Sequence, residues 1–481
     1  MDQYKVQKPF QFIIFGATGD LASLKLFPAF FELFLKGKLP ENFSIIGFGR
    51  TVMNRDAFRK IFKLSILRKK DDDDKEAQEA AEKLLEKVEY FVGQYTEEKD
   101  FHALFTFCDE LLLPFKLGEE ADGGSVSSRF ARVAYFSIPP NVFEPVIKNL
   151  AVARDRDGAE KCQDLRVVIE KPFGTDANSA AELFHVLSGH FYEEKIYLLD
   201  HYLGKKPIQS ILKLRMENNV MNTMLQGSEI ANIQITAFEE ADVGKRVGYF
   251  DQVGIMKDMI QSHLLQILAL IAMEIPLYPT VESLQREKNN IVSAVRFSGN
   301  SDDAVFGQYE SYRQEKDGTG ISQTDTFCAV KLFIDRRNWF NVPIYLRTGK
   351  KMEKSYMRVV IEFKKMPFQG PMVQPNRLIF ELRPSEELTL ELDHVKLSKT
   401  TQCEGDDCLG DYSSLIFDIL SERKLNFLSF PEILAAWKVI DEVGNTRKKL
   451  APEPEIYKDI SSGPTSYLTL PVRDGFHWYD F

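Results

Sequence analysis

A glycine turn near the N-terminus constrains the fold of this chain more than any other feature of its sequence. The turn, Gly16-Ala-Thr-Gly19-Asp-Leu-Ala22, follows the apolar run Phe10–Phe15 and precedes a helical pattern that continues through Leu35. A second apolar run, Phe43–Phe48, comes next. Strand, glycine turn, helix and strand in this order predict one βαβ unit at the start of a parallel sheet.

Strand-like runs continue to alternate with helical stretches over about the first 200 residues. The later runs are Arg132–Ile138, Arg166–Ile169 and Ile196–Leu199. Among the helical stretches, Arg68–Glu89 alternates charges with Ala and Leu, which predicts a solvated helix. This pattern predicts a Rossmann-like α/β domain over residues 1–200.

The rhythm of the sequence changes after residue 200. A long helical stretch, Ile255–Glu274, precedes several strand-like runs with little helix between Phe327 and about Leu397. Residues 201–481 are therefore expected to form an α+β domain with a large, mostly antiparallel sheet. This domain is the candidate region for substrate binding and dimerisation.

The net charge limits the partners that the chain can bind. Its 481 residues include 61 Lys and Arg against 71 Asp and Glu, a formal charge of −10. That balance argues against a general nucleic-acid binder and against a polybasic membrane-surface protein. An anionic ligand would need a locally basic site.

The N-terminus and the cysteines favour a cytoplasmic protein. Met1–Phe10 is polar and short and fits no signal peptide. The longest mostly apolar run, Leu264–Met273, is too short to span a bilayer. The five cysteines are odd in number and spread out, which fits a reducing compartment. Cys403 and Cys408 are expected to be incidental thiols of a loop, because no histidine lies near them.

The glycine turn is a candidate dinucleotide site. Glycines let the backbone approach a pyrophosphate, and the following helix offers free N–H groups at its N-terminus. The candidate cofactor-binding residues are Gly16, Thr18, Gly19, Asp20 and Leu21. A plain tight turn is the alternative, because this glycine spacing alone is weak evidence.

The residue after the second strand distinguishes the two nicotinamide dinucleotides. An acid there would bind a ribose 2′-hydroxyl, whereas this chain has Gly49-Arg50-Thr51. A guanidinium suits a 2′-phosphate, so NADP is favoured over NAD. The alternative is that Arg50 is an ordinary surface residue.

Two further groups of polar side chains follow apolar strands. The block Asp200-His201-Tyr202-Leu-Gly204-Lys205 follows Ile196–Leu199, and Glu170-Lys171-Pro172 follows Arg166–Ile169. An Asp–His pair can handle a proton, and Tyr, Lys and protonated His together can hold a phosphate. Lys171 can bond a substrate hydroxyl, and its bond to proline is a candidate for the cis form. The alternatives are a capped strand-to-helix turn and an exposed turn lysine.

His263 is a candidate general base. It lies in the otherwise largely apolar helix Asp258–Gln266, about one turn from Asp258. Hydride transfer from an alcohol needs a base, and only His201 and His263 of the seven histidines lie among other candidate site groups. A buried structural histidine is the alternative.

Taken together, these motifs resemble those of glucose-6-phosphate dehydrogenases. The resemblance covers nearly the whole chain and is weakest between Lys70 and Ala131 and after about Ser398. The Asp200–Lys205 block is highly specific, whereas the glycine turn is not. The matching segments, in the family's order and spacing, are Gly16–Ala22, Glu170–Gly174, Asp200–Lys205, Asp258–Gln266 and Leu346–Lys350.

The resemblance implies oxidation of glucose 6-phosphate at C1 to 6-phosphoglucono-1,5-lactone, with hydride transfer to NADP, in the pentose phosphate pathway. By position, His263 would remove the C1 hydroxyl proton, and Asp200 would orient its imidazole. No metal is required for this chemistry. The family also implies a homodimer or homotetramer, with neither nucleic acid nor membrane as a partner. The implied substrate-binding residues are His201, Tyr202 and Lys205 for the phosphate, and Lys171, Glu239, Asp258 and Lys350 for the hydroxyls; Lys171 would also contact the cofactor.

Some positions depart from the family pattern. Leu198 stands where many members carry Arg, and Ser355 stands where many carry a second basic residue, which Lys351 or Lys354 could replace. Two other functions stay open. One is a sugar oxidoreductase of the glucose-fructose oxidoreductase type, against which the Asp200–Lys205 block argues. The other is a catalytically silent NADP-binding sensor, against which the presence of every candidate catalytic side chain argues.

Overall fold

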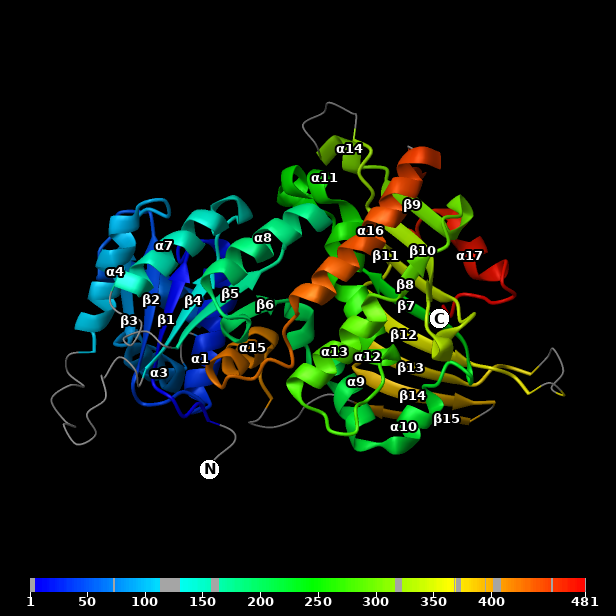
Figure 1. Ribbon diagram of the computed structural model, residues 1–481, viewed down its shortest axis with the longest axis horizontal. Helices are drawn as coiled ribbons and strands as arrows, with labels where there is room; N and C mark the ends of the chain where they lie inside the picture. Colours follow the sequence, from blue (N-terminus) through cyan, green and yellow to red (C-terminus); the bar gives the residue numbers. More distant parts are fainter. Residues whose placement is uncertain are drawn as a thin grey trace. The chain divides into compact units, whose positions relative to one another are not determined.

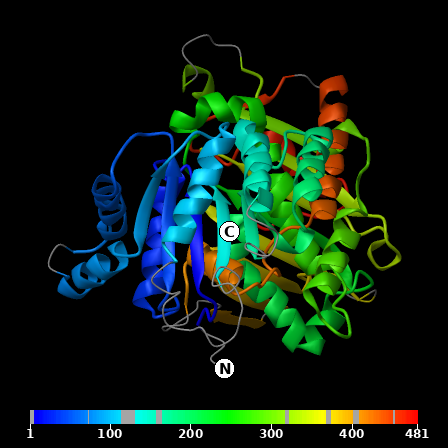
Figure 2. The ribbon, with the colours of Figure 1, turned by 60° about the vertical axis from the view of Figure 1, so that its left-hand side comes forward.

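The fold is that of a computed structural model of the chain. The structure describes residues 5–71, 74–112, 130–156, 164–315, 322–366, 368, 373–393, 395–400, 408–450 and 453–480. The chain divides into two compact units (Figures 1 and 2). The first unit takes residues 1–174, 178–205 and 403–428, and the second takes residues 175–177, 206–402 and 429–481. A late segment of the sequence thus belongs to the first unit. The domain bounds 1–200 and 201–481 stay a prediction.

The first unit contains a six-stranded, wholly parallel sheet in the order β3-β2-β1-β4-β5-β6. Every residue of β1 and of β4 is buried, because helices cover both faces of the sheet (Figure 1). This architecture confirms the predicted Rossmann-like α/β fold. The strands are β1 (Phe10–Phe15), β2 (Phe43–Gly49), β3 (Val88–Val92), β4 (Ala131–Phe136), β5 (Leu165–Glu170) and β6 (Ile196–Leu199).

The helices of the first unit pack in two groups, with α1, α2, α3 and α15 in one and α4 and α7 in the other. Aromatic side chains fill much of the core; the ring centroids of Phe27 and Phe62, for example, lie 4.4 Å apart. The longer helices are α1 (Phe27–Leu35), α2 (Arg55–Leu67), α3 (Lys75–Leu85), α4 (Glu98–Glu110), α7 (Phe143–Arg156), α8 (Ala177–His190) and α15 (Asp411–Leu420). Short helical turns are η1 (Ala22–Leu26), η2 (Pro140–Val142), η3 (Glu193–Lys195) and η4 (His201–Gly204).

One sequence prediction in this unit is wrong at both ends. Within the range Arg68–Glu89, helix α3 begins only at Lys75 and stops at Leu85, and Val88 begins strand β3. Val88 and Tyr90 are buried where β3 pairs with β2. Burial at the sheet edge therefore overrides the local helical pattern.

The second unit contains a ten-stranded sheet with the path β15-β14-β13-β12-β7-β11-β10-β9-β16, and β8 pairs with β10. Most pairs are antiparallel, while β7–β11 and β9–β16 are parallel, which confirms the expected mostly antiparallel sheet. The strands are β7 (Ile230–Phe238), β8 (Val295–Phe297), β9 (Ala304–Tyr309), β10 (Phe327–Ile334), β11 (Ile344–Gly349), β12 (Tyr356–Phe363), β13 (Arg377–Arg383), β14 (Glu387–Leu392), β15 (Val395–Thr400) and β16 (Glu455–Tyr457).

The helices of the second unit include one long composite segment, α11–η6–α12. It spans Val247–Ala272 and is long and apolar enough to cross a bilayer. However, 83% of its most apolar 18-residue stretch is buried inside the protein, as in a core helix. The helices are α9 (Lys206–Glu217), α10 (Asn219–Met224), α11 (Val247–Ile255), α12 (Leu265–Ala272), α13 (Val281–Val292), α14 (Tyr312–Glu315), α16 (Phe430–Leu450) and α17 (Thr469–Val472). The helical turns are η5 (Gly244–Arg246), the π-helix η6 (Met256–Leu264), η7 (Ser301–Asp303), η8 (Arg337–Trp339) and η9 (Thr465–Leu468).

The cysteines differ from the sequence expectation at one position. Cys108 and Cys328 are free and buried, whereas Cys408 is disulfide-bonded. The expectation of an incidental thiol is therefore wrong for Cys408, and Cys403 lies outside the described residues.

Candidate active site

The glycine turn has the geometry that a phosphate cradle needs. Gly16 has φ +83°, and a Cβ there would lie 2.1 Å from the carbonyl oxygen of Ser137, so the backbone admits only glycine. The N–H of Gly19 donates to the oxygen of Gly16 at 3.0 Å and closes the turn. Thr18, Gly19 and Asp20 are exposed. The turn leaves its rim and the start of the following helix open to an anionic ligand.

Arg50 directly follows strand β2, at the same edge of the parallel sheet as the glycine turn. Its side chain is exposed, and its guanidinium carbon lies 5.5 Å from the ring centroid of Tyr95. Within the described part of the chain Arg50 forms no ion pair with a carboxylate. The guanidinium therefore lies at the sheet edge where the glycine turn begins, with no carboxylate partner among the described residues.

Lys171 follows strand β5 at the same edge, and the Lys171–Pro172 peptide bond is cis, as the sequence suggested. Beside it, the carboxylate of Glu170 accepts hydrogen bonds from the hydroxyls of Tyr135 and, at 3.4 Å, Tyr412. Burial raises the pKa of Glu170 to about 7, although both tyrosine hydroxyls and Lys171 act in the opposite direction. A partly buried acid that titrates near neutrality thus lies next to a predicted ligand-binding lysine.

The Asp200–Lys205 block forms the helical turn η4 at the end of strand β6. Asp200 is fully buried, and its Oδ1 accepts the N–H of Tyr202 at 3.0 Å, so it caps the turn as the alternative interpretation proposed. The imidazole of His201 packs edge-on against Tyr202, with centroids 4.9 Å apart. The Nζ of Lys205 lies 4.8 Å from the centroid of the Tyr202 ring. Two side chains that are cationic or can be protonated, those of His201 and Lys205, thus lie against the Tyr202 ring on one short turn.

Helix α15 packs with its first residues against this turn. The Oδ2 of Asp411 lies 3.8 Å from the Nζ of Lys205. A Cβ at Gly204 would lie 2.6 Å from the carbonyl oxygen of Asp411, so glycine permits the close approach of the helix. The ring of Tyr412 stacks on His201 with centroids 6.3 Å apart and 14° between the planes.

The second unit brings three of the predicted substrate-binding residues together. The Nζ of Lys350 lies 2.7 Å from Glu239 Oε2 and 3.5 Å from Asp258 Oδ2. Glu239 follows β7 and Lys350 follows β11; these strands are parallel neighbours, so their ends meet at one edge. Lys350 is 3% exposed, whereas the two carboxylates remain partly open. The cluster presents acceptors and a donor of the kind that sugar hydroxyls need.

His263 lies near the end of the π-helix η6, which also contains Asp258. Because a π-helix bonds residue i to residue i+5, these two residues are one turn apart. Gly254, with φ 71° and ψ 165°, breaks the helical path just before η6. The imidazole of His263 is 2% exposed. His263 and Asp200 belong to different compact units, and their pairing stays a prediction.

The positions that depart from the family pattern have local partners. Leu198 is buried in β6, and its carbonyl accepts the N–H of Leu428 at 3.0 Å. The Nζ of Lys351 lies 3.1 Å from Asp459 Oδ2, and its role in place of a basic residue at position 355 stays a prediction. Lys354 is exposed.

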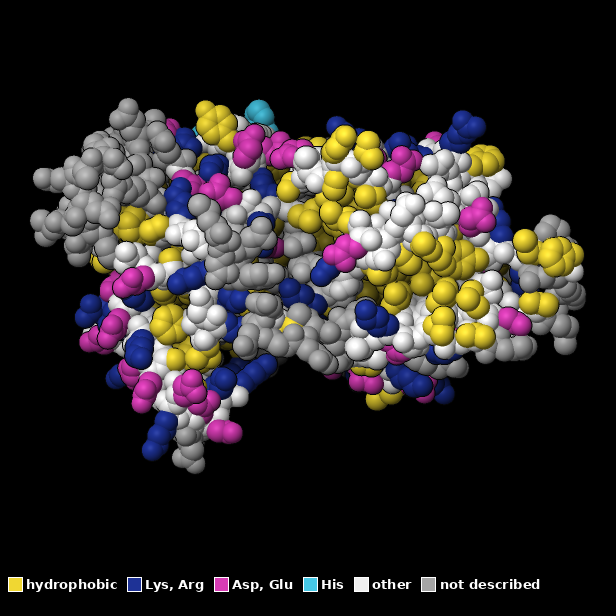
Figure 3. All heavy atoms as spheres, turned by 90° about the horizontal axis from the view of Figure 1, so that it is seen from below, with side chains coloured by type: hydrophobic (Ala, Val, Ile, Leu, Met, Phe, Trp, Pro, Cys, Tyr) yellow, Lys and Arg dark blue, Asp and Glu magenta, His cyan; other side chains and the backbone are white. Residues whose placement is uncertain are grey.

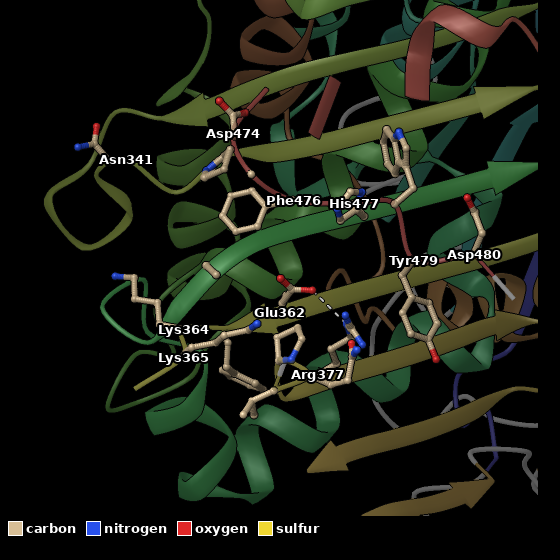
Figure 4. Close-up of a pocket in the computed structure, with 18 of the residues that line it drawn as sticks. Asn341, Glu362, Lys364, Lys365, Arg377, Asp474, Phe476, His477, Tyr479 and Asp480 are labelled. Atoms are coloured by element: carbon tan, nitrogen blue, oxygen red, sulfur yellow. Dashed lines mark hydrogen bonds and ion pairs between the residues drawn. The ribbon is translucent and has the colours of Figure 1, made fainter. Parts of the chain in front are cut away.

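A cavity of about 1200 Å³ in the second unit contains none of the predicted site residues. It lies between the C-terminal tail and strands β12 and β13, with His477 and Tyr479 on one side and Glu362 and Arg377 on the other (Figure 4). Arg377 Nε and Glu362 Oε2 form an ion pair at 3.0 Å within it. The size of a cavity therefore does not identify the predicted site in this chain.

Sequence reasoning missed several residues that surround the candidate site. One of them, Glu170, belongs to a motif that the sequence shows, but no local signal marks the other four as site residues. These side chains come near the candidate site only because strands and helices distant in sequence pack together. They are Tyr95, Tyr135, Glu170, Asp411 and Tyr412.

Comparison with known proteins gives a consistent result over both units. Family models match residues 13–210 (glucose-6-phosphate dehydrogenase, NAD binding domain) and residues 212–479 (glucose-6-phosphate dehydrogenase, C-terminal domain). The chain is 31% identical to glucose-6-phosphate 1-dehydrogenase of Bacillus subtilis, over 97% of this chain and 98% of that protein. It is similar to a solved structure of glucose-6-phosphate dehydrogenase in complex with its substrate glucose-6-phosphate, with a TM-score of 0.87, 27% identity and full coverage of both chains. A Mycobacterium avium glucose-6-phosphate 1-dehydrogenase structure gives a TM-score of 0.82 at 26% identity, over 98% of this chain and 99% of that one.

Proposed function

This chain belongs to the glucose-6-phosphate dehydrogenase family, and we propose on that premise that it oxidises glucose 6-phosphate at C1 to 6-phosphoglucono-1,5-lactone. The reaction is the oxidation of a ring hydroxyl, with a hydride passing to a nicotinamide dinucleotide. The observation that carries the proposal is that the two family models together span nearly the whole chain, including the Asp200–Lys205 block.

The proposed cofactor is NADP. The turn at Gly16, followed by the exposed Thr18, Gly19 and Asp20 and the partly buried Leu21, fits a pyrophosphate. Arg50 supplies an exposed guanidinium at the end of β2, which suits a 2′-phosphate. Bound NADP would accept the hydride from C1.

The proposed substrate contacts form two groups, one for the phosphate and one for the sugar hydroxyls. His201, Tyr202 and Lys205 would bind the phosphate, since they supply two cationic or protonatable groups and a hydroxyl on one turn. Sugar hydroxyls would be held by Glu239, Asp258, Lys350 and Lys171, and Lys171 would also contact the cofactor. The phosphate lies far from the reacting carbon and so supplies orientation rather than chemistry.

His263 is the proposed general base. A neutral imidazole has an ordinary pKa near 6.5, so it can accept the C1 hydroxyl proton at neutral pH. Asp200 would orient that imidazole and stabilise its charged form. The neighbouring carboxylate of Asp258, one turn earlier on η6, would hold a hydroxyl of the same sugar ring.

The remaining proposals concern the whole protein. Residues 1–200 would serve as the dinucleotide-binding domain and residues 201–481 as the domain for substrate binding and dimerisation. We propose that the protein is cytoplasmic and forms a homodimer or a dimer of dimers.

A spectrophotometric assay tests the function directly. Purified protein mixed with NADP and glucose 6-phosphate should produce the absorbance of NADPH. Equal efficiency with unphosphorylated glucose would favour the glucose-fructose oxidoreductase type instead. Bound NADP without any turnover from mildly acidic to mildly alkaline pH would favour a silent sensor.

A further inference from the structure

A buried acid in the first unit has no role in the proposed mechanism. Glu170 ends strand β5, and two tyrosine hydroxyls donate to its two carboxylate oxygens, Tyr135 to Oε1 and Tyr412 to Oε2. Tyr135 comes from β4 and Tyr412 from the first turn of α15. The carboxylate therefore joins the carboxyl edge of the sheet to a helix more than two hundred residues later in the sequence.

The tyrosine of α15 connects this acid to the candidate phosphate site. The ring of Tyr412 lies parallel to the imidazole of His201, with 14° between the planes and 6.3 Å between the centroids. His201 also packs edge-on against Tyr202, with the ring centroids 4.9 Å apart. The imidazole thus contacts two tyrosines, and the hydroxyl of one of them, Tyr412, donates to Glu170.

We propose that Glu170 is a positioning residue for the sugar phosphate: it fixes Tyr412, and Tyr412 fixes the imidazole of His201 in the orientation that binds the phosphate. The inference rests on the proposed function, because it concerns the phosphate that His201 would bind. Glu170 touches neither reacting carbon nor proton in this scheme, so its influence belongs to substrate affinity and not to the chemical step.

The charge state of Glu170 sets how firmly Tyr412 is held. The groups that face the carboxyl are Tyr135, Tyr412, Lys171 and Asp200. Burial, with a smaller contribution from Asp200, raises the pKa of Glu170 to about 7, while the tyrosine hydroxyls and Lys171 oppose the rise. The ionised carboxylate accepts two charge-assisted hydrogen bonds, which are stronger than those of the protonated acid. The hold on Tyr412 therefore tightens as the pH rises through about 7.

The substitution Glu170→Gln separates this role from ordinary titration of the site. The amide keeps the shape of the side chain but cannot ionise. We expect the ratio of KM for glucose 6-phosphate, variant over native, to be close to one near pH 6 and to rise to about tenfold above pH 8, with kcat within about threefold. The phosphate of the substrate also titrates in this range, but it does so with both proteins and cancels from the ratio. With glucose, which has no phosphate, the corresponding ratio of kcat/KM should stay near one.

A double-mutant cycle tests the route through the tyrosine. Tyr412→Phe should raise KM for glucose 6-phosphate as Glu170→Gln does, and the double variant should be no worse than the poorer single variant, because both changes break one connection. Tyr197→Phe is the matched control: Tyr197 is a buried tyrosine of β6 whose ring packs on Phe427 at 4.9 Å, and its replacement should leave KM unchanged.

Thermal unfolding distinguishes positioning from structural support. Because the folded state raises the pKa of Glu170, this residue favours folding below about pH 4.5 and loses that contribution as the pH rises to about 7. Glu170→Gln should therefore have a Tm at or above that of the native protein at pH 8, while binding the sugar phosphate more weakly.

Three results would overturn the inference in a native protein that is active. They are a KM ratio that does not change with pH, an equal loss with glucose, and independent, multiplicative effects of the two single substitutions. A native protein that produces no NADPH would instead refute the proposed function. Tyr412→Phe keeps the test decisive if Glu170→Gln fails to fold.

Discussion

His263 is the residue on which the proposed proton transfer depends. It lies in a π-helical segment, a geometry that is rare and often found at functional sites. We expect His263→Ala to lower kcat by roughly 10²–10⁴-fold, the usual effect of losing a general base, without weakening NADP binding. Steady-state kinetics and the fluorescence of bound NADPH measure the two effects. His185→Ala, at an exposed position on α8, serves as the control. A near-normal kcat for His263→Ala would mean that another group takes the proton.

Arg50 is the residue that should decide between the two dinucleotides. Its exposed guanidinium has no carboxylate partner among the described residues, so its removal leaves no orphaned charge behind. We expect Arg50→Ala to lower kcat/KM for NADP by about 10- to 100-fold, the worth of hydrogen bonds to a charged group. NAD lacks the 2′-phosphate, so kcat/KM for NAD should change by no more than about twofold. Equal losses with both cofactors would show that Arg50 only supports the turn.

At the scale of single elements, the ends of the predicted strands were the sequence feature that best located the candidate site residues. Gly16, Arg50, Lys171 and Asp200 each follow an apolar run, and alternating strands and helices predict that such runs are parallel. Parallel strands end at one edge of a sheet, so the four positions could be grouped from the sequence alone. The sheet order confirms that grouping for the first unit. The same reasoning did not extend to β3, where a helical charge pattern continued into a buried strand at Val88.

Helix α15 shows where prediction from the sequence stops. Its periodicity marks a helix, but nothing in the local pattern says that Asp411 and Tyr412 contact Lys205 and His201. Those contacts depend on the path of the chain after some two hundred intervening residues of the second unit. Pairwise contacts of this kind come from tertiary packing, on which the periodicity of hydrophobic residues carries no information.

Arg166 anchors the opposite end of α15 to the sheet. Its buried guanidinium donates to the carbonyls of Ile419 and Leu420 at 2.6 and 2.9 Å, and it pairs with Asp164 at 2.6 Å. Arg166→Met should lower the free energy of unfolding by about 3 kcal/mol, because it leaves buried acceptors and a carboxylate without this partner. Urea unfolding measures the loss, and Arg286→Met, at an exposed position on α13, should change stability by less than about 0.5 kcal/mol.

The pH dependence of that loss provides a second check. The hydrogen bonds from Arg166, Lys195 and Lys8 hold the pKa of Asp164 well below its usual range, although burial acts in the opposite direction. A depressed carboxyl pKa adds stability above about pH 4, which is lost as the pH falls. The difference between native protein and Arg166→Met should therefore narrow in acid. A constant difference would mean that the carbonyl contacts, and not the ion pair, account for the loss.

In the molecule as a whole, the Leu346–Lys350 motif contacts two different regions of the second unit. Lys350, just beyond β11, joins Glu239 and Asp258 in the candidate substrate cluster. Arg347, three residues earlier, is 1% exposed and lies 4.1 Å from the centroid of Trp478 in the C-terminal tail. The motif therefore combines a predicted ligand contact just after β11 with a packing contact to the C-terminal tail within the strand.

The outer strand β15 presents a surface that the proposed dimer would cover. Among the described residues it pairs with β14 alone, all six of its residues are exposed, and Val395 and Leu397 are 54% and 57% exposed. Hydrophobic side chains gather on the face of the second unit seen in Figure 3. An edge strand with exposed aliphatic residues is a template for pairing with another chain, and natural proteins cover such edges. Light scattering after size exclusion should therefore give at least twice the chain mass of 55.2 kDa. The double substitution Val395→Lys and Leu397→Lys should give the mass of a single chain, whereas Val52→Lys, at an exposed position of the first unit, should not. A native protein that is monomeric at micromolar concentration, or a lysine variant that still dimerises, would place the subunit contact elsewhere.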